Sequence, residues 1–305
     1  MQQDIAFHSW GCRIAGTLHV PDDYVTGQKR LAVVMCHGMA NDRDESGQHI
    51  FMGKKLEEAG YVVLRFDFRG CGVSGAPRGR MLIGTEWPQD LRNAITYLGM
   101  RPEVDPERIG VMGSSWGGGV TAHTAAIDRR IKCAVSLGAP ASGERWLRNQ
   151  WVTQHGEEGW RKFLVDVAAD QQRRVQGKVS QVVRLIGGFI PVESDQIPFY
   201  DEFLAAQPIM VSDVPLEVAD DVLFFWPEEM ADRIAPTPVR FIHGTADPVV
   251  APHEASIFYE RAREPKDLCL IEDGIHQLLS PEDNGEDKAN EVADLVLEWF
   301  GEHLT

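Results

Sequence analysis

Three features that would indicate other kinds of protein are missing from this 305-residue sequence. No stretch approaches the ~20 consecutive apolar residues of a membrane helix, and Met1-Gln2-Gln3-Asp4 lacks the basic and apolar segments of a signal peptide. Basic residues are outnumbered, 30 against 46 acidic ones, which gives a net charge of −16 and disfavours nucleic acid and anionic membranes as partners. We therefore expect a soluble, cytoplasmic protein.

The five cysteines predict neither a disulfide framework nor a zinc site, because their number is odd, they are scattered and no CxxC pair occurs. We expect no metal and no other cofactor. We interpret most of the cysteines as buried, inert thiols. The alternative concerns Cys71, which lies in the glycine-rich run Arg69-Gly70-Cys71-Gly72, where a thiol near the mouth of a pocket could react.

Strand and helix patterns alternate along most of the chain. Residues 3–8 and 13–20 predict an antiparallel hairpin, and continuous apolar runs such as 31–36 are typical of strands buried on both faces of a parallel sheet. The further strands are expected at 61–66, 108–112, 131–137, 239–242 and 267–271, and helices at 46–59, 86–99, 116–127, 252–263 and 286–302. The fold class is therefore α/β, with a mostly parallel central sheet flanked by helices.

The alternation stops between Gly138 and about residue 235, where amphipathic stretches rich in tryptophan and phenylalanine predict an inserted, mainly helical cap. Residues 1–138 and 236–305 would then form the two parts of one core domain, with residues 139–235 as the cap. The acidic run at 281–287 is interpreted as a solvated loop.

The strongest local motif is Gly113-Ser114-Ser115-Trp116-Gly117, which matches G-x-S-x-G between a predicted strand and a predicted helix. Small residues allow the chain to turn sharply there and to expose the hydroxyl of Ser115 at the carboxyl edge of the sheet. Alternatively, such a turn only packs closely or binds a phosphate at the helix N-terminus. The lysine of a P-loop and the G-x-G-x-x-G spacing of a dinucleotide site are absent, which favours the nucleophile.

With these motifs the chain resembles the α/β-hydrolase superfamily, in particular its dienelactone-hydrolase, cinnamoyl-esterase and related serine-esterase branches. The resemblance rests on His37-Gly38-Met39, on the segment 67–74, on the serine motif and on two later loops. It implies an α/β-hydrolase fold for nearly the whole sheet domain, whereas the cap matches nothing that we can place.

In that superfamily an acid and then a histidine follow the nucleophile. Two residues fit this order: Asp247 after the predicted strand 239–242 and His276 after the last predicted strand. His276 would accept the proton of Ser115, and Asp247 would orient and stabilise the imidazole. Taken singly, Asp247 could be a turn residue and His276 a surface histidine. The competing acids and histidines are Glu272, Asp273, His243 and His123, of which we expect His243 to pack under the acid loop.

The resemblance also implies an oxyanion hole built from the backbone N–H groups of Met39 and Trp116. Asp67 and Arg69, a charged pair after a strand, are interpreted as structural anchors of their loop rather than as catalytic groups.

The leading hypothesis is a serine hydrolase that cleaves a small apolar carboxylic ester through an acyl-enzyme. The same triad could instead act on a carbon–carbon, lactone, amide or peptide bond, or transfer an acyl group to another acceptor. An alternative of another class is a non-catalytic scaffold that binds a ligand or a partner protein. The sequence leaves the oligomeric state open, a homodimer being one option. A histidine base predicts that activity rises with pH through about 6 to 7.

Overall fold

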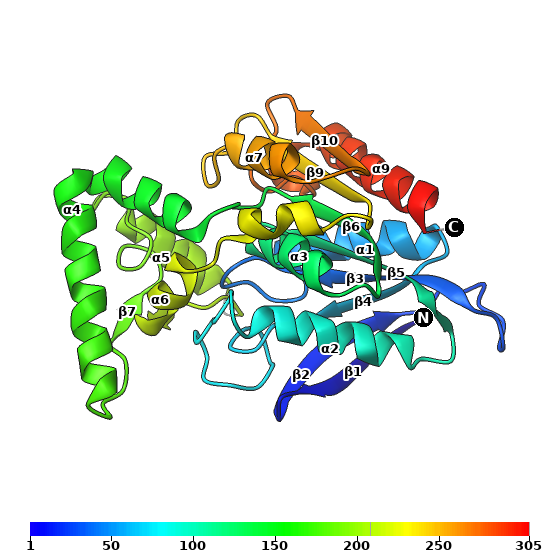
Figure 1. Ribbon diagram of the computed structural model, residues 1–305, viewed down its shortest axis with the longest axis horizontal. Helices are drawn as coiled ribbons and strands as arrows, with labels where there is room; N and C mark the ends of the chain where they lie inside the picture. The colour runs from blue at the N-terminus through cyan, green and yellow to red at the C-terminus, as the bar shows by residue number, and fades with distance from the viewer. Residues whose placement is uncertain (208, 305) are drawn as a thin grey trace.

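The computed structural model describes residues 1–207 and 209–304, apart from the side chains at positions 203 and 206. In this part of the chain an eight-stranded sheet has the order β1-β2-β4-β3-β5-β6-β9-β10 (Figure 1). Strands β3 to β10 of this sheet run parallel, and β1 and β2 pair antiparallel. The strands are β1 Gln2–Ser9, β2 Cys12–His19, β3 Arg30–Cys36, β4 Val62–Phe66, β5 Val104–Ser114, β6 Ile131–Leu137, β9 Val239–Gly244 and β10 Lys266–Ile271.

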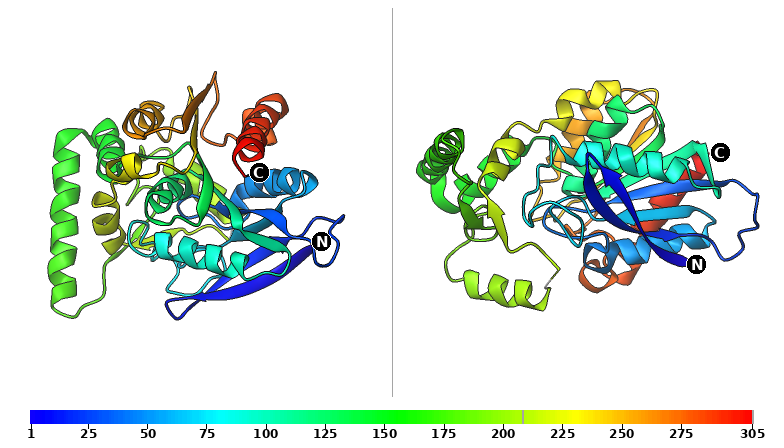
Figure 2. Two further views of the ribbon diagram at one scale, coloured as in Figure 1. Left: turned by 45° about the vertical axis from the view of Figure 1, so that its right-hand side comes forward. Right: turned by 90° about the horizontal axis from the view of Figure 1, so that it is seen from below.

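Helices cover both faces of the sheet (Figure 2). One core lies under α2, α3 and α7, and the other lies under α1 and α9. In β3, Ala32 and Val34 point into the first core and Val33 and Met35 into the second, which explains why this strand is apolar from Leu31 to Cys36. The helices are α1 Gln48–Glu58, α2 Trp87–Gly99, α3 Trp116–Ile127, α7 His253–Arg261 and α9 Glu286–His303.

The predicted order of strands and helices in the sheet domain is therefore confirmed, including the opening hairpin and the central position of β3. Boundaries differ by a few residues; β5 begins at Val104 rather than at 108, and a one-turn 3-10 helix, η1 Glu45–Gly47, precedes α1.

The chain leaves the sheet after β6 and returns in β9, which pairs with β6. The intervening segment projects away from the sheet, most clearly along α4 (Figure 1). It contains α4 Gly143–Val175, α5 Ile197–Ala206, α6 Glu217–Leu223 and the 3-10 helix η2 Pro227–Arg233. Two short antiparallel strands, β7 Val182–Arg184 and β8 Asp213–Pro215, were not predicted, because three residues are too few to show an alternating pattern.

The prediction of a solvated loop at 281–287 is wrong. A short helix, α8 Pro281–Asn284, forms there, and α9 begins at Glu286. The hydroxyl of Ser280 accepts the N–H of Asp283 at 3.2 Å, and proline occupies the first turn, where its missing N–H is tolerated. In the described chain, no helix is both long enough and apolar enough to cross a bilayer.

Candidate active site

Ser115 lies in the tight turn between β5 and α3, with φ 53° and ψ −124°, a conformation that is unfavourable for a residue with a side chain. Its N–H donates to the carbonyl of Leu137 at 2.7 Å, which holds the turn against β6. A Cβ on Gly113 would collide with the carbonyl oxygen of Gly117, and a Cβ on Gly117 would collide with that of Cys36. The two glycines of the motif are therefore sterically required.

His276 and Asp247 are in contact. Asp247 lies in the turn after β9 and His276 in the loop after β10, and the Nδ1 of His276 is 2.7 Å from Oδ2 of Asp247. Because the carboxylate accepts at this distance, Nδ1 carries the hydrogen and Nε2 keeps its lone pair. This tautomer is the one that can accept a proton from a nucleophile.

Asp247 is buried, and four N–H groups surround its carboxylate. Oδ1 accepts the N–H groups of Val249 at 2.8 Å and Val250 at 2.9 Å, and Oδ2 lies 3.2 Å from Nε2 of His243. Burial alone would raise the pKa of Asp247, but the hydrogen bonds from His243 and His276 outweigh it and hold the pKa well below its usual range. Asp247 is therefore ionised at neutral pH.

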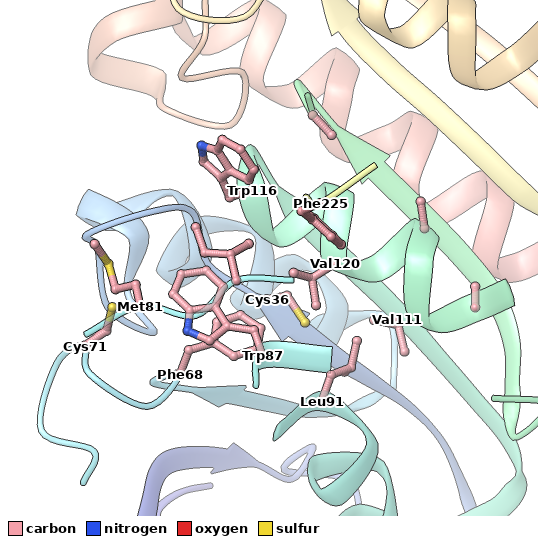
Figure 3. Close-up of a cluster of buried hydrophobic side chains, with 14 of the residues drawn as sticks. Cys36, Phe68, Cys71, Met81, Trp87, Leu91, Val111, Trp116, Val120 and Phe225 are labelled. Carbon is pink, nitrogen blue, oxygen red and sulfur yellow. The ribbon is translucent and has the colours of Figure 1, made fainter. Parts of the chain in front are cut away.

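Ser115 and His276 line the same cavity, which has a volume of about 520 Å³. Residues from the sheet domain and from the inserted segment enclose it, so the predicted nucleophile and base share one ligand-accessible space. Its apolar wall is formed by Trp116, Trp146, Leu185, Ile186, Ile190, Met210 and Val249. The ring of Trp116 is buried next to Phe225, above the aromatic core of the domain (Figure 3).

Met39 and Trp116 line the same cavity as Ser115, Met39 from the loop after β3 and Trp116 from the start of α3. In the part of the chain that the structure describes, neither of their backbone N–H groups has a protein acceptor. The N–H of Trp116 also belongs to the first turn of a helix, where unpaired N–H groups favour negative charge. Both N–H groups therefore belong to residues of the cavity wall and lack a described protein acceptor.

A residue that the sequence analysis missed completes this region. The carboxyl Oε2 of Glu45 accepts the N–H of Gly38 at 2.5 Å, and the side chain is 5% exposed and lines the cavity. Burial raises the pKa of Glu45 to about 8. The one signal in the sequence was the place of Glu45 in the loop after β3, which ends at Cys36 and lies beside β5, the strand that leads to Ser115.

The competing acids and histidines do not join Ser115 in this cavity. His243 is buried under the acid loop, as expected, with Nε2 2.9 Å from the carbonyl oxygen of Val250. Glu272 and Asp273 are exposed, and His123 lies in a separate groove beside Phe225.

Asp67 and Arg69 anchor loops, as predicted, but through separate partners. Asp67 accepts the N–H groups of Arg43 and Val73, each at 2.9 Å, and Arg69 pairs with Asp90 inside the protein. Neither residue lines the cavity that contains Ser115.

The thiol of Cys71 is 1% exposed, and burial raises its pKa well above the usual value, which supports the interpretation of an inert thiol. Within residues 1–207 and 209–304, no group of three histidine, cysteine, aspartate or glutamate side chains is arranged to hold a metal ion.

Comparison with known proteins assigns the chain to a family. A family model described as alpha/beta hydrolase fold matches residues 32–282. An uncharacterized 31.7 kDa protein of Escherichia coli is 26% identical over 302 residues, covering 98% of this chain and 99% of its own. The polyketide transferase GrgF of Penicillium is 25% identical over 260 residues, which cover 81% of each chain. Its crystal structure superposes with a TM-score of 0.81 at 21% identity and covers 100% of this chain and 99% of GrgF. Est1E of Butyrivibrio proteoclasticus, solved with ferulic acid bound, has a TM-score of 0.71 at 16% identity over 97% and 99% of the two chains.

Proposed function

Because the chain belongs to the alpha/beta hydrolase family, we propose that it is a serine hydrolase that cleaves a carboxylic ester through an acyl-enzyme. The observation that carries the proposal is the hydrogen bond of 2.7 Å between His276 and Asp247, in a loop that shares one cavity with the strained Ser115. A structural histidine would not need an ionised partner and a free nitrogen facing a cavity.

The proposed reaction has two steps. His276 takes the proton of Ser115 as the hydroxyl attacks the ester carbonyl, and the N–H groups of Met39 and Trp116 stabilise the resulting oxyanion. His276 then protonates the leaving alcohol, and an acyl-Ser115 ester remains. In the second step water attacks this ester with the same histidine as base, the carboxylic acid leaves, and Ser115 regains its proton.

The wall of the cavity favours an uncharged, largely apolar acyl group. Two tryptophans and several aliphatic side chains form one side, and no lysine or arginine is among the described residues that line the cavity. Two carboxylates, Glu282 and Asp283, lie at its edge. An anionic substrate would therefore lose its hydration without gaining a counter-ion.

Labelling with a fluorophosphonate and hydrolysis of p-nitrophenyl butyrate test the proposal. Wild type should be labelled at Ser115, and Ser115→Ala should lose both labelling and hydrolysis. Ser114→Ala is the matched control, because Ser114 is the adjacent hydroxyl but is directed to His49, with an Oγ to Nε2 distance of 3.2 Å. Absence of both labelling and hydrolysis in wild type would exclude the proposal.

A second candidate is acyl transfer, in which an alcohol or amine rather than water takes the acyl group from Ser115. The similarity to GrgF, which is named a polyketide transferase, favours this possibility. Product analysis in the presence of increasing glycerol or hydroxylamine separates the two. A transferase forms mainly the new ester or hydroxamate at millimolar acceptor, whereas a hydrolase continues to release the free acid.

A further inference from the structure

Glu45 occupies a loop whose backbone is held in an unfavourable conformation. Glu45 and Ser46 have φ of 48° and 51°, and Gly47 follows at 92°, so three successive residues lie in the left-handed region. Such a run persists where surrounding contacts impose it.

Those contacts come from residues just before Glu45. Asp44 forms an ion pair with Arg65 of β4 and does not line the cavity. The N–H of Arg43 donates to Asp67 at 2.9 Å. The N–H of Asp44 also donates to Oδ1 of Asp42 at 3.0 Å. Contacts with Arg65 and Asp67 thus hold the loop in place, and the side chain of Glu45 is buried.

The inward carboxyl lies across Gly38 from the proposed nucleophile. Its Oε2 accepts the Gly38 N–H at 2.5 Å, and a methyl group placed on Gly38 would lie 3.0 Å from Oε1 of Glu45 and 3.1 Å from Cβ of Ser115. Gly38 precedes Met39, whose N–H is the second proposed oxyanion donor. The hydrogen bond from Gly38 to Glu45 therefore fixes the peptide plane next to the one that carries this donor.

In the part of the chain that the structure describes, no lysine or arginine is among the groups that act on the carboxyl of Glu45. The described residues that line the cavity include no lysine or arginine. The titratable groups closest in the chain are Asp42 of the same loop and the buried histidines His37 and His49 on its two sides. The neighbouring loop contributes the buried thiol of Cys71. The cavity contributes His276 and two acids, Glu282 and Asp283.

The nearest of these groups do not favour ionisation of Glu45. Burial lowers the pKa of His37 and of His49, so both imidazoles are neutral, and burial raises the pKa of the Cys71 thiol. Burial raises the pKa of Glu45 to about 8, because burial together with repulsion from Asp42 outweighs the hydrogen bond from Gly38, which by itself would lower the pKa. Glu45 is a neutral acid at pH 7.

We propose that Glu45 is a positioning residue for the oxyanion hole, that it acts as a neutral carboxylic acid, and that its ionisation turns catalysis off at alkaline pH. The inference rests on the proposed function. A neutral acid accepts the Gly38 N–H without placing charge beside the oxyanion. An ionised carboxylate would accept this N–H more strongly, but it would oppose the negative charge that develops on the substrate oxygen.

The pH profile of kcat for p-nitrophenyl butyrate, from pH 5 to 9.5, tests this proposal on the intact protein. Wild type should show a maximum and then a fall of about tenfold between pH 8 and 9.5, as expected for a single required acid. Glu45→Gln, which keeps the shape and neutrality of the acid, should keep the rising limb and lose the falling limb. Glu45→Ala should lower kcat about tenfold or more with a smaller change in KM, because the oxyanion donor is no longer held.

Asp221→Asn is the matched control, because Asp221 is also a carboxyl with a pKa raised by burial and accepts a backbone N–H, that of Gly84, at 2.5 Å. It lies in the groove beside Phe225 and should leave the profile unchanged.

A wild-type rate that stays constant up to pH 9.5 would overturn the proposal without any variant. A falling limb that persists in Glu45→Gln would overturn it as well. Failure of the proposed function is distinguishable, because wild type would then show neither fluorophosphonate labelling nor hydrolysis at any pH.

Discussion

At the scale of single residues, the carboxylate of Asp247 accepts two backbone N–H groups and lies against two imidazoles, those of His243 and His276. Asp247→Asn would present an amide N–H₂ to the Nδ1–H of His276 and so favour the wrong tautomer. We expect kcat to fall about 10³- to 10⁴-fold. Steady-state hydrolysis of p-nitrophenyl butyrate measures it.

The control is Asp273→Asn, an exposed acid three residues before His276, which should keep its activity. If Asp247→Asn stays within about tenfold of wild type, Asp247 is not the acid of the triad.

Glu45 also predicts a pH dependence of stability. Burial raises its folded pKa to about 8, above the ordinary unfolded value, so the stabilisation is complete below the unfolded pKa and is lost as pH rises through about 8. Glu45→Gln carries no ionisable group and should escape this loss. Its Tm should equal that of wild type near pH 4 and exceed it at pH 8 to 9, as thermal unfolding followed by circular dichroism would show. Equal values at every pH would mean that Glu45 is not held neutral.

At the scale of elements, α8 supports the loop that carries His276. The buried side chain of Asn284 accepts the N–H of Ile275 at 3.1 Å and donates to the carbonyl of Leu278 at 3.0 Å, on the two sides of the histidine. Asn284→Ala should cost about 1–3 kcal/mol in the free energy of unfolding, because two buried backbone groups lose their partner. It should also lower kcat/KM about fivefold or more, because the loop would no longer hold the imidazole of His276 in one position.

Urea unfolding and ester hydrolysis measure these two effects. The control is Asn290→Ala in α9, a half-buried residue whose amide donates to the carbonyl of Glu286. The free energy of unfolding and kcat/KM should change little in Asn290→Ala. An equally mild effect of Asn284→Ala would contradict the supporting role of α8.

The elements that the sequence predicted are those whose cause is local. In strand β3 the residues from Leu31 to Cys36 are apolar because both faces are covered, and Gly113 is required because a Cβ there would collide with Gly117, four residues later. Glu45 could not be predicted in the same way. Its inward direction depends on partners distant in sequence, Arg65 and Asp67, and on a left-handed run that no propensity favours. The helix α8 had a local signal in Ser280 and Pro281, which the acidic composition concealed.

At the scale of the whole molecule, the net charge of −16 should act on the substrate before any contact forms. The rim carboxylates Glu282 and Asp283 add to this field at the cavity. An ester whose acyl chain ends in a carboxylate should therefore react slowly at low salt, and its kcat/KM should rise several-fold between about 10 mM and 500 mM sodium chloride, because the Debye length falls from about 30 Å to a few ångström.

A neutral ester of the same length provides the control, since screening leaves its approach unchanged and its kcat/KM should stay constant over the same range of salt. The double variant Glu282→Gln, Asp283→Asn separates the rim from the global charge. If the rim dominates, the variant removes most of the salt effect for the anionic ester. If the remaining acidic residues dominate, the salt effect persists. An anionic ester that reacts as fast as the neutral one at 10 mM salt would contradict both, and would point to a cationic contact inside the cavity.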